Sequence, residues 1–83
     1  MNIKILGTGC PACRNMYTDV TKIVARNKID AEVEYVQDIA QILSYGVMST
    51  PALVIDGRVI MIGYRGPTKL EQALKESVET VLS

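Results

Sequence analysis

The sequence predicts a single α/β domain over residues 1–83, with strands and helices in the order βαβαββα. The apolar residues change several times between the short period of a strand and the longer period of a helix. Turn-forming residues mark each change. The apolar content of 48% is typical of a folded domain, and a chain of this length has room for one such domain.

The first two elements predicted are a short strand and a helix. The strand covers residues 3–6 and ends at the Gly7-Thr8-Gly9 turn. Pro11 suits the first turn of the helix, where its missing N–H costs nothing, and Asn27 is a suitable end. The apolar face of this helix consists of Cys13, Met16, Tyr17, Val20, Ile23 and Val24.

An edge strand and a short helix are predicted next. Residues 31–36 alternate between apolar and charged side chains, as in a half-exposed strand. Asp38 and Gln41 form a capping-box pattern at the start of a helix of about two turns, and Gly46 can end it. The apolar residues of that helix are Ile39, Ile42 and Leu43.

The last part of the chain predicts a hairpin and a final helix. Apolar runs at 52–55 and 58–62 flank Asp56-Gly57, a strong signal for a tight β-turn. Thr68 and Glu71 form a second capping-box pattern, so Thr68 is expected to cap the final helix. The helix must cover one face of the sheet with Leu70, Ala73, Leu74, Val78, Val81 and Leu82.

Composition excludes several classes of function. Without histidine there is no His-activated nucleophile, histidine metal site or imidazole switch. Nine basic and nine acidic residues balance, and the basic ones are scattered, which argues against nucleic-acid binding. The apolar runs are too short for a secretory signal or a membrane span. We therefore expect a cytoplasmic monomer that needs no cofactor or metal and binds neither nucleic acid nor membranes.

The motif that carries chemistry is Cys10-Pro11-Ala12-Cys13, in the turn between the first strand and the first helix. Cα atoms three residues apart on a helical turn lie about 5–6 Å from each other, which a disulfide can bridge. Cys10 is at the N-cap, where free N–H groups and the helix dipole stabilise a thiolate, whereas Cys13 faces inward. Thiol–disulfide exchange requires one thiol that attacks and a second that resolves the mixed disulfide.

Other interpretations of the two cysteines are open at this point. They could be buried packing residues, although a position that opens a helix favours redox chemistry. A structural zinc site needs four ligands, but two thiolates suit Cu(I), so a small copper chaperone is the alternative function. Such a ferredoxin-like chaperone runs βαββαβ and ends on a strand, whereas this sequence ends on a helix. A redox-inactive docking module is a third interpretation.

A second motif, Ser49-Thr50-Pro51, immediately precedes the hairpin. Proline cannot donate to a β-ladder, so a trans proline at the start of a strand is the simpler interpretation. A cis bond would instead turn the backbone of Thr50 toward the cysteines, where its N–H and C=O can bind an extended substrate segment.

Together these motifs resemble the thioredoxin superfamily over essentially the whole chain. The Cys-Pro-x-Cys form is similar to glutaredoxin, and the Gly-Thr-Gly-Cys start and the stretch 46–57 are similar to small thioredoxin-like "redox-active disulfide" proteins. The resemblance implies a thioredoxin fold, with a four-stranded mixed sheet in the order 2-1-3-4 and helices on both faces. It also implies that Cys10 is the nucleophile, Cys13 the resolving thiol and Pro51 a cis-proline.

The function implied is a thiol–disulfide oxidoreductase that transfers two electrons to a protein disulfide. Its partners would be a disulfide-containing protein substrate and a thioredoxin-reductase-like or other dithiol electron donor. We expect the substrate to lie along the backbone of Thr50 and Pro51 by strand addition, with further contacts from Met48 and from Gly9 in the turn before Cys10.

The sequence departs from the family pattern at two places. Many thioredoxins have a buried carboxylate six residues before the first cysteine, which accepts the proton of the second; here Lys4 stands there. Proton transfer must therefore differ, with water as one acceptor. Glutaredoxins follow their hairpin with Gly-Gly and an acidic residue that help hold glutathione. Gly63-Tyr64-Arg65-Gly66 occupies that region here, which argues against glutathione binding.

Overall fold

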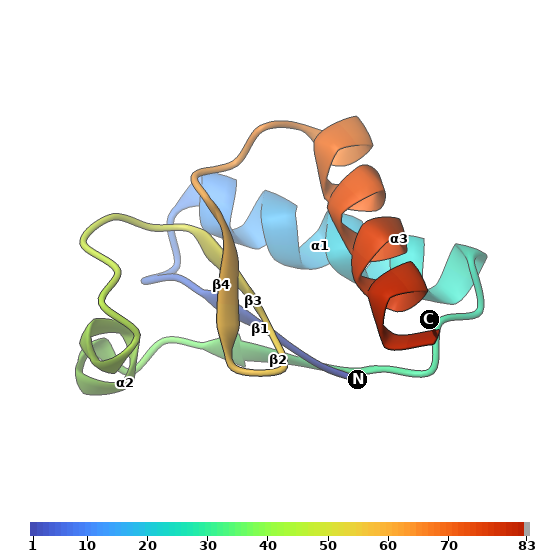
Figure 1. Ribbon diagram of the computed structural model, residues 1–83. Helices are drawn as coiled ribbons and strands as arrows, with labels where there is room; N and C mark the ends of the chain where they lie inside the picture. Colours follow the sequence, from blue (N-terminus) through green and yellow to red (C-terminus); the bar gives the residue numbers. More distant parts are fainter. Residues whose placement is uncertain (83) are drawn as a thin grey trace.

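The structure, a computed structural model, describes residues 1–82 and the side chains of residues 1–78. Four strands form one sheet in the order β2-β1-β3-β4. Strands β1 and β2 are parallel, and the other neighbours are antiparallel, which confirms the mixed sheet and the element order expected (Figure 1). The elements are β1 (Asn2–Leu6), α1 (Pro11–Arg26), β2 (Glu32–Val36), α2 (Ile39–Ser44), β3 (Ala52–Ile55), β4 (Arg58–Ile62) and α3 (Pro67–Leu82).

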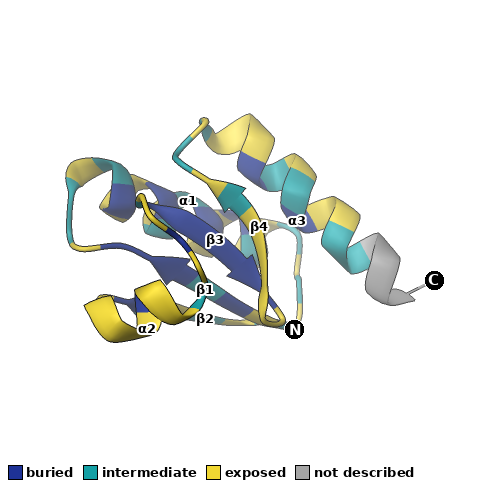
Figure 2. Cartoon of the chain, turned by 60° about the vertical axis from the view of Figure 1, so that its left-hand side comes forward, coloured by how far each residue is buried: buried dark blue, intermediate teal, exposed yellow. Residues whose placement is uncertain are grey.

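Apolar side chains form a core on each face of the sheet, because successive residues of a strand point to opposite faces. Helices α1 and α3 lie side by side over one face, and α2 lies at the end of the other (Figures 1 and 2). The larger core contains Ile3, Ile5, Met16, Val20, Ile23, Leu53, Ile55, Leu70 and Leu74. The smaller core contains Leu6, Val36, Ile42, Val47, Ala52 and Val54.

The structure confirms the start of α2 and shows how its apolar residues are placed. Asp38 caps the helix as expected, since its side chain accepts a hydrogen bond from the backbone N–H of Ala40. Only Ile42 of the three apolar residues is buried, however, while Ile39 and Leu43 are 62% and 60% exposed. A helix of six residues at the end of a sheet can pack only a small part of its surface against that sheet. In α2 this part consists of one apolar side chain, that of Ile42.

The start of α3 is corrected by the structure. The helix begins at Pro67, so Thr68 lies inside its first turn and is not the N-cap. The N–H of Leu70 donates to the carbonyl of Gly66, and proline at the first helical position leaves no donor unsatisfied. Leu70 and Leu74 are buried as expected. The side chains of Val81 and Leu82, expected on the same face, lie outside the described side chains.

The hairpin between β3 and β4 turns at Asp56 and Gly57, as expected. Their φ angles of 50° and 82° are both left-handed, as a two-residue turn of the I′ type requires. The Asp56 side chain accepts a hydrogen bond from the N–H of Asn2, which ties the turn to β1. Farther along, Met61 pairs with Leu53 and Val59 with Val54, so Ile60 is the extra residue of a β-bulge.

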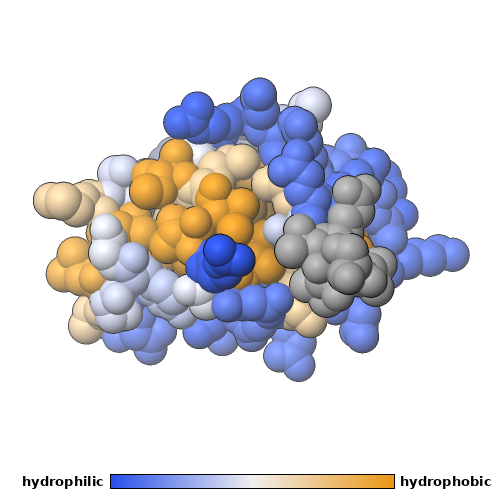
Figure 3. Space-filling model, viewed as in Figure 1, coloured by the Kyte–Doolittle hydropathy of each residue, from blue (hydrophilic) through white to orange (hydrophobic). Residues whose placement is uncertain are grey.

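Strand β4 forms one edge of the sheet and keeps apolar side chains at the surface. Val59, Ile60 and Ile62 are all exposed. Figure 3, in the same view as Figure 1, shows apolar surface gathered in the middle of this face, where β4 lies. None of the helices in residues 1–82 combines the length and the apolar character needed to cross a bilayer.

Polar contacts fasten α3 and the segment before it to α1. Tyr64 donates a hydrogen bond to Asp19, which together with burial raises the pKa of the tyrosine above its ordinary value. At the C-terminal end of α1, Arg26 forms an ion pair with Glu71, and the Asn27 side chain donates to the same carboxylate. These hydrogen bonds, that of Arg26 foremost, hold the pKa of Glu71 below its ordinary value of 4.5.

The lowered pKa of Glu71 predicts a pH-dependent contribution to stability. A carboxylate with a lowered pKa in the folded state stabilises the fold above the pKa of the unfolded chain, and this contribution is lost as the pH falls through the folded pKa. We expect Glu71→Gln to lower the unfolding midpoint slightly at pH 7 and to leave it close to that of the wild type well below pH 4.5. Thermal unfolding across this pH range tests the expectation. A difference that persists unchanged in acid would contradict it.

Candidate redox site

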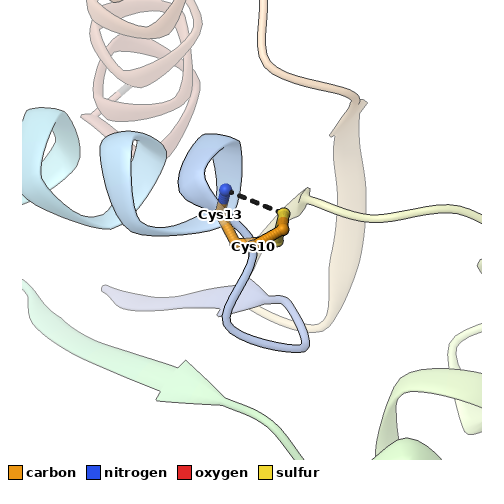
Figure 4. Close-up of a disulfide and its surroundings, with 2 residues drawn as sticks. All are labelled: Cys10 and Cys13. Atoms are coloured by element: carbon orange, nitrogen blue, oxygen red, sulfur yellow. Dashed lines mark hydrogen bonds between the residues drawn. A yellow bond between two sulfur atoms is a disulfide. The ribbon is translucent and has the colours of Figure 1, made fainter.

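The two cysteines lie where the chain passes from β1 into α1. Cys10 is the N-cap of α1, with extended backbone, and Pro11 opens the helix. Cys10 and Cys13 form a disulfide whose Cα atoms are 5.1 Å apart, within the range expected from the motif. The backbone N–H of Cys13 donates to Cys10 Sγ at 3.2 Å (Figure 4). A free N–H of the first helical turn therefore points at the sulfur of Cys10.

The two sulfurs differ in their access to solvent. Cys13 is completely buried, whereas Cys10 is partly exposed. Cys10 also has the helix N-terminus beside it, which favours a negative charge on its sulfur once the disulfide is reduced. The geometry gives the two thiols unequal surroundings.

Gly7 lies against the buried cysteine. A Cβ at this position would come within 2.7 Å of Cys13 Cβ and 2.8 Å of Cys13 Sγ. Real Cβ atoms essentially never make contacts this short, so only glycine lets the chain after β1 pass this close to α1. The sequence motif pointed to Gly7 as a turn residue, but the close approach depends on how α1 packs on the sheet.

Tyr35 also reaches this place, from the neighbouring strand β2. A Cβ at Gly7 would lie 3.3 Å from the Tyr35 hydroxyl. The ring of Tyr35 packs against that of Tyr17, with the centroids 5.4 Å apart. The hydroxyl is buried and has no hydrogen-bond partner among the described residues. Sequence reasoning missed this residue as part of the site, although its position on the inward side of an alternating strand was a signal.

Lys4 faces away from the cysteines. It is on β1 with its side chain toward the smaller core, where Nζ donates to the Tyr45 hydroxyl at 3.3 Å and lies 5.9 Å from the centroid of that ring. The residue that replaces the family's buried carboxylate therefore takes no part in the surroundings of Cys13.

The segment before β3 lies beside the cysteine turn. Leu6 pairs with Ala52 across the sheet, so Pro51 is next to Gly7, where the β1–α1 turn begins. The Thr50–Pro51 peptide bond is cis, the geometry that the resemblance implies. Within residues 1–82, the backbone of Thr50 makes no hydrogen bond. The pairing of β1 with β3 therefore places the N–H and C=O of Thr50, which make no hydrogen bond within residues 1–82, beside the turn that carries the cysteines.

Met48 and Gly9 flank this backbone. Met48 is 97% exposed, so nearly its whole apolar side chain is open to contact. Gly9 has a φ of 95°, a conformation that favours glycine and lets the chain turn into the N-cap. All of the predicted site residues therefore lie in the turn that carries the cysteines or in the segment that enters β3.

The structure does not favour a metal chaperone. The chain ends on α3 after a hairpin, rather than on the strand of a ferredoxin-like chaperone. A disulfide at a helix N-terminus, beside a cis-proline in this sheet, is the site of a thiol–disulfide oxidoreductase.

Comparisons with known proteins agree with this class. The family model described as "Thioredoxin domain" matches residues 1–79. Thioredoxin from Methanothermobacter thermautotrophicus is 34% identical over 83 residues, covering 100% of this chain and 99% of that protein. Thioredoxin from Methanocaldococcus jannaschii is 34% identical over 80 residues, covering 96% of this chain and 88% of that protein. The chain belongs to the thioredoxin family.

The fold is shared with a more distant protein as well. The structure of thioredoxin 1 from Thermosipho africanus superposes with a TM-score of 0.72 at 18% identity, and the match covers 100% of both chains. The resemblance inferred from the sequence is confirmed, and with it the thioredoxin fold and a redox function for the Cys10–Cys13 pair.

Proposed function

We propose that the protein exchanges two electrons with disulfides of other proteins, with Cys10 as the nucleophile and Cys13 as the resolving thiol. The unequal burial of the two sulfurs is the observation that carries this assignment. Cys10, at the helix N-terminus, can meet a substrate, while Cys13 can meet only Cys10.

The reaction takes place in two exchanges. The Cys10 thiolate attacks a substrate disulfide, which forms a mixed disulfide and releases one substrate thiol. Cys13 then attacks Cys10 Sγ, which forms the intramolecular disulfide and releases the second substrate thiol. The substrate gains two electrons and two protons, and a reductase-type dithiol donor returns them to the cysteine pair.

The substrate is proposed to lie in an extended conformation along Thr50 and Pro51. The unused N–H and C=O of Thr50 support this, because an added strand binds through such main-chain groups. Met48 offers an exposed apolar contact on one side, and Gly9 leaves room for a close backbone on the other.

The proposed setting is that of a single domain acting as a monomer in the cytoplasm. A dithiol that must be re-reduced after each turnover suits a compartment with a supply of reducing donors. Glutathione is not proposed as a ligand, because the segment after the hairpin lacks the Gly-Gly and acidic pattern of glutaredoxins.

Selective alkylation tests the roles of the cysteines. With limiting iodoacetamide near neutral pH, the reduced protein should be modified at Cys10 at least about tenfold faster than at Cys13, because a helix N-terminus lowers the pKa of a thiol. Mass spectrometry of peptides after complete labelling with a second reagent measures the ratio. The preference should vanish in denaturant. Equal labelling of the folded protein, or a preference for Cys13, would contradict the assignment.

A further inference from the structure

The hydroxyl of Tyr35 is the one buried side-chain oxygen or nitrogen of the described residues that has no hydrogen-bond partner. Burying a hydroxyl without a partner costs free energy, so such a group needs an explanation. Here the structure is in its oxidised form, with the Cys10–Cys13 disulfide closed. A disulfide sulfur is a poor acceptor, but the same sulfur as a thiol or thiolate is a better one.

The position of the hydroxyl makes Cys13 its natural partner. The point 2.8 Å from Cys13 Sγ, where a Cβ would stand on Gly7, is 3.3 Å from the Tyr35 hydroxyl. Because residue 7 is glycine, it places no side chain of its own beside these two groups. Cys13 is completely buried in the structure, so a group of the protein is better placed than solvent to donate a hydrogen bond to its sulfur.

We propose that Tyr35 donates a hydrogen bond to the sulfur of Cys13 when the disulfide is open. Opening the disulfide frees Cys13 Sγ from Cys10 and lets the side chain turn toward the hydroxyl. The bond stabilises the Cys13 thiolate and, with it, the reduced form of the protein. In the oxidised form the bond is absent, and the hydroxyl is left without a partner.

The hydrogen bond would act in the second exchange of the proposed reaction. Cys13 loses its proton, and the resulting thiolate attacks Cys10 Sγ. The Cys10–Cys13 bond forms, the bond between Cys10 and the substrate breaks, and the proton lost by Cys13 ends on the departing substrate sulfur. Tyr35 keeps its own proton throughout, so it stabilises charge without being consumed. Lys4 cannot do this, because it binds Tyr45 on the other face of the sheet.

The proposal rests on the resolving role of Cys13. A reaction with two phases tests the hydrogen bond of Tyr35 separately from the roles of the cysteines. The reduced protein reacts with excess 5,5′-dithiobis(2-nitrobenzoate), which releases one coloured thiolate when the first cysteine attacks and a second when the intramolecular disulfide closes. In Tyr35→Phe, which keeps the ring packed on Tyr17, the first phase should be unchanged. The second should be about threefold slower, because about tenfold less Cys13 thiolate is present, while the less stabilised thiolate is the stronger nucleophile and offsets about half of that loss on a logarithmic scale.

Two equilibrium measurements distinguish a redox role from a structural one. The equilibrium constant of Tyr35→Phe with glutathione should shift about tenfold toward the oxidised protein, equivalent to a potential about 30 mV more negative. The oxidised variant should be at least as stable as the wild type in thermal unfolding, and the reduced variant less stable. A merely structural tyrosine would change both forms alike and leave the potential where it is.

Tyr45→Phe is the matched control, because it removes a hydroxyl from the opposite face of the sheet. It should leave both phases and the potential unchanged. If Tyr35→Phe behaves like this control, the hydrogen bond to Cys13 is refuted while the roles of the cysteines stand. If Tyr35→Phe slows the first phase instead of the second, the roles of the cysteines are reversed and the proposed function fails as well.

Discussion

Replacing Cys10 by serine is expected to abolish reduction of protein disulfides completely. The variant keeps the buried Cys13, but this sulfur has no access to a substrate. Cys13→Ser should behave differently, because Cys10 at the helix N-terminus can still attack and then has no thiol to release it. Incubation with a disulfide-containing protein, followed by a non-reducing gel and peptide mass spectrometry, should show a mixed disulfide at Cys10 in Cys13→Ser and none in Cys10→Ser.

The trapped complex also tests where the substrate lies. The backbone amides of residues 48–52 should shift in the NMR spectrum of the mixed disulfide, since Thr50 offers its unused main-chain groups to the substrate. The amides of the Asp56-Gly57 turn, at the other end of β3, should stay in place. Unmoved signals at 48–52 would refute the docking site, and trapping at Cys13 would refute the assignment of the nucleophile.

A methyl group at Gly7 is expected to have the second large effect. In Gly7→Ala the new Cβ would overlap Cys13 Cβ and Sγ, at 2.7 and 2.8 Å, so α1 must move away from β1. Overpacking of this kind costs about 1–3 kcal/mol of unfolding free energy. Because the methyl stands against Cys13 and the Tyr35 hydroxyl, disulfide exchange should also slow. Denaturant unfolding and the rate of reduction of a protein disulfide measure the two effects.

Gly46→Ala is the control for the Gly7 variant. Gly46 has a φ of 76°, and a Cβ there meets no atom within 4 Å, so this variant changes only the conformational preference of the backbone. It should lose some stability while its exchange rate stays that of the wild type. Wild-type stability and activity in Gly7→Ala would contradict the prediction. They would show that residue 7 and Cys13 can move apart at no cost in free energy.

Most of the fold could be predicted from the sequence because local signals agree with the tertiary structure. The apolar periods, the Asp56-Gly57 turn and the cap at Asp38 are all read from residues close together in the chain. The burial of single residues is harder to predict, because it depends on partners that are distant in the chain. Ile39 and Leu43 have helical spacing with Ile42, but the sheet ends before it can cover them.

The candidate site divides in the same way. The cysteine pair and its helix N-terminus form one local motif, so both could be located from the sequence. Tyr35 and Gly7 belong to the site only because β2 runs parallel to β1 and α1 crosses above them, and no spacing in the chain encodes that proximity. Pro51 could be placed beside the cysteines through the resemblance to a family, since its position next to Gly7 depends on the pairing of β1 with β3.

The β-bulge at Ile60 affects how readily copies of the protein can associate through the edge of the sheet. An exposed, regular strand with apolar side chains is a template on which a second copy can extend the sheet, and such growth leads to fibrils. Strand β4 carries exposed Val59, Ile60 and Ile62, but the extra residue at Ile60 twists this edge and breaks its regular spacing of donors and acceptors. A neighbouring strand can therefore match β4 on one side of the bulge and not on both. The irregularity lets the chain keep an apolar edge in solvent without offering it as a seed for aggregation.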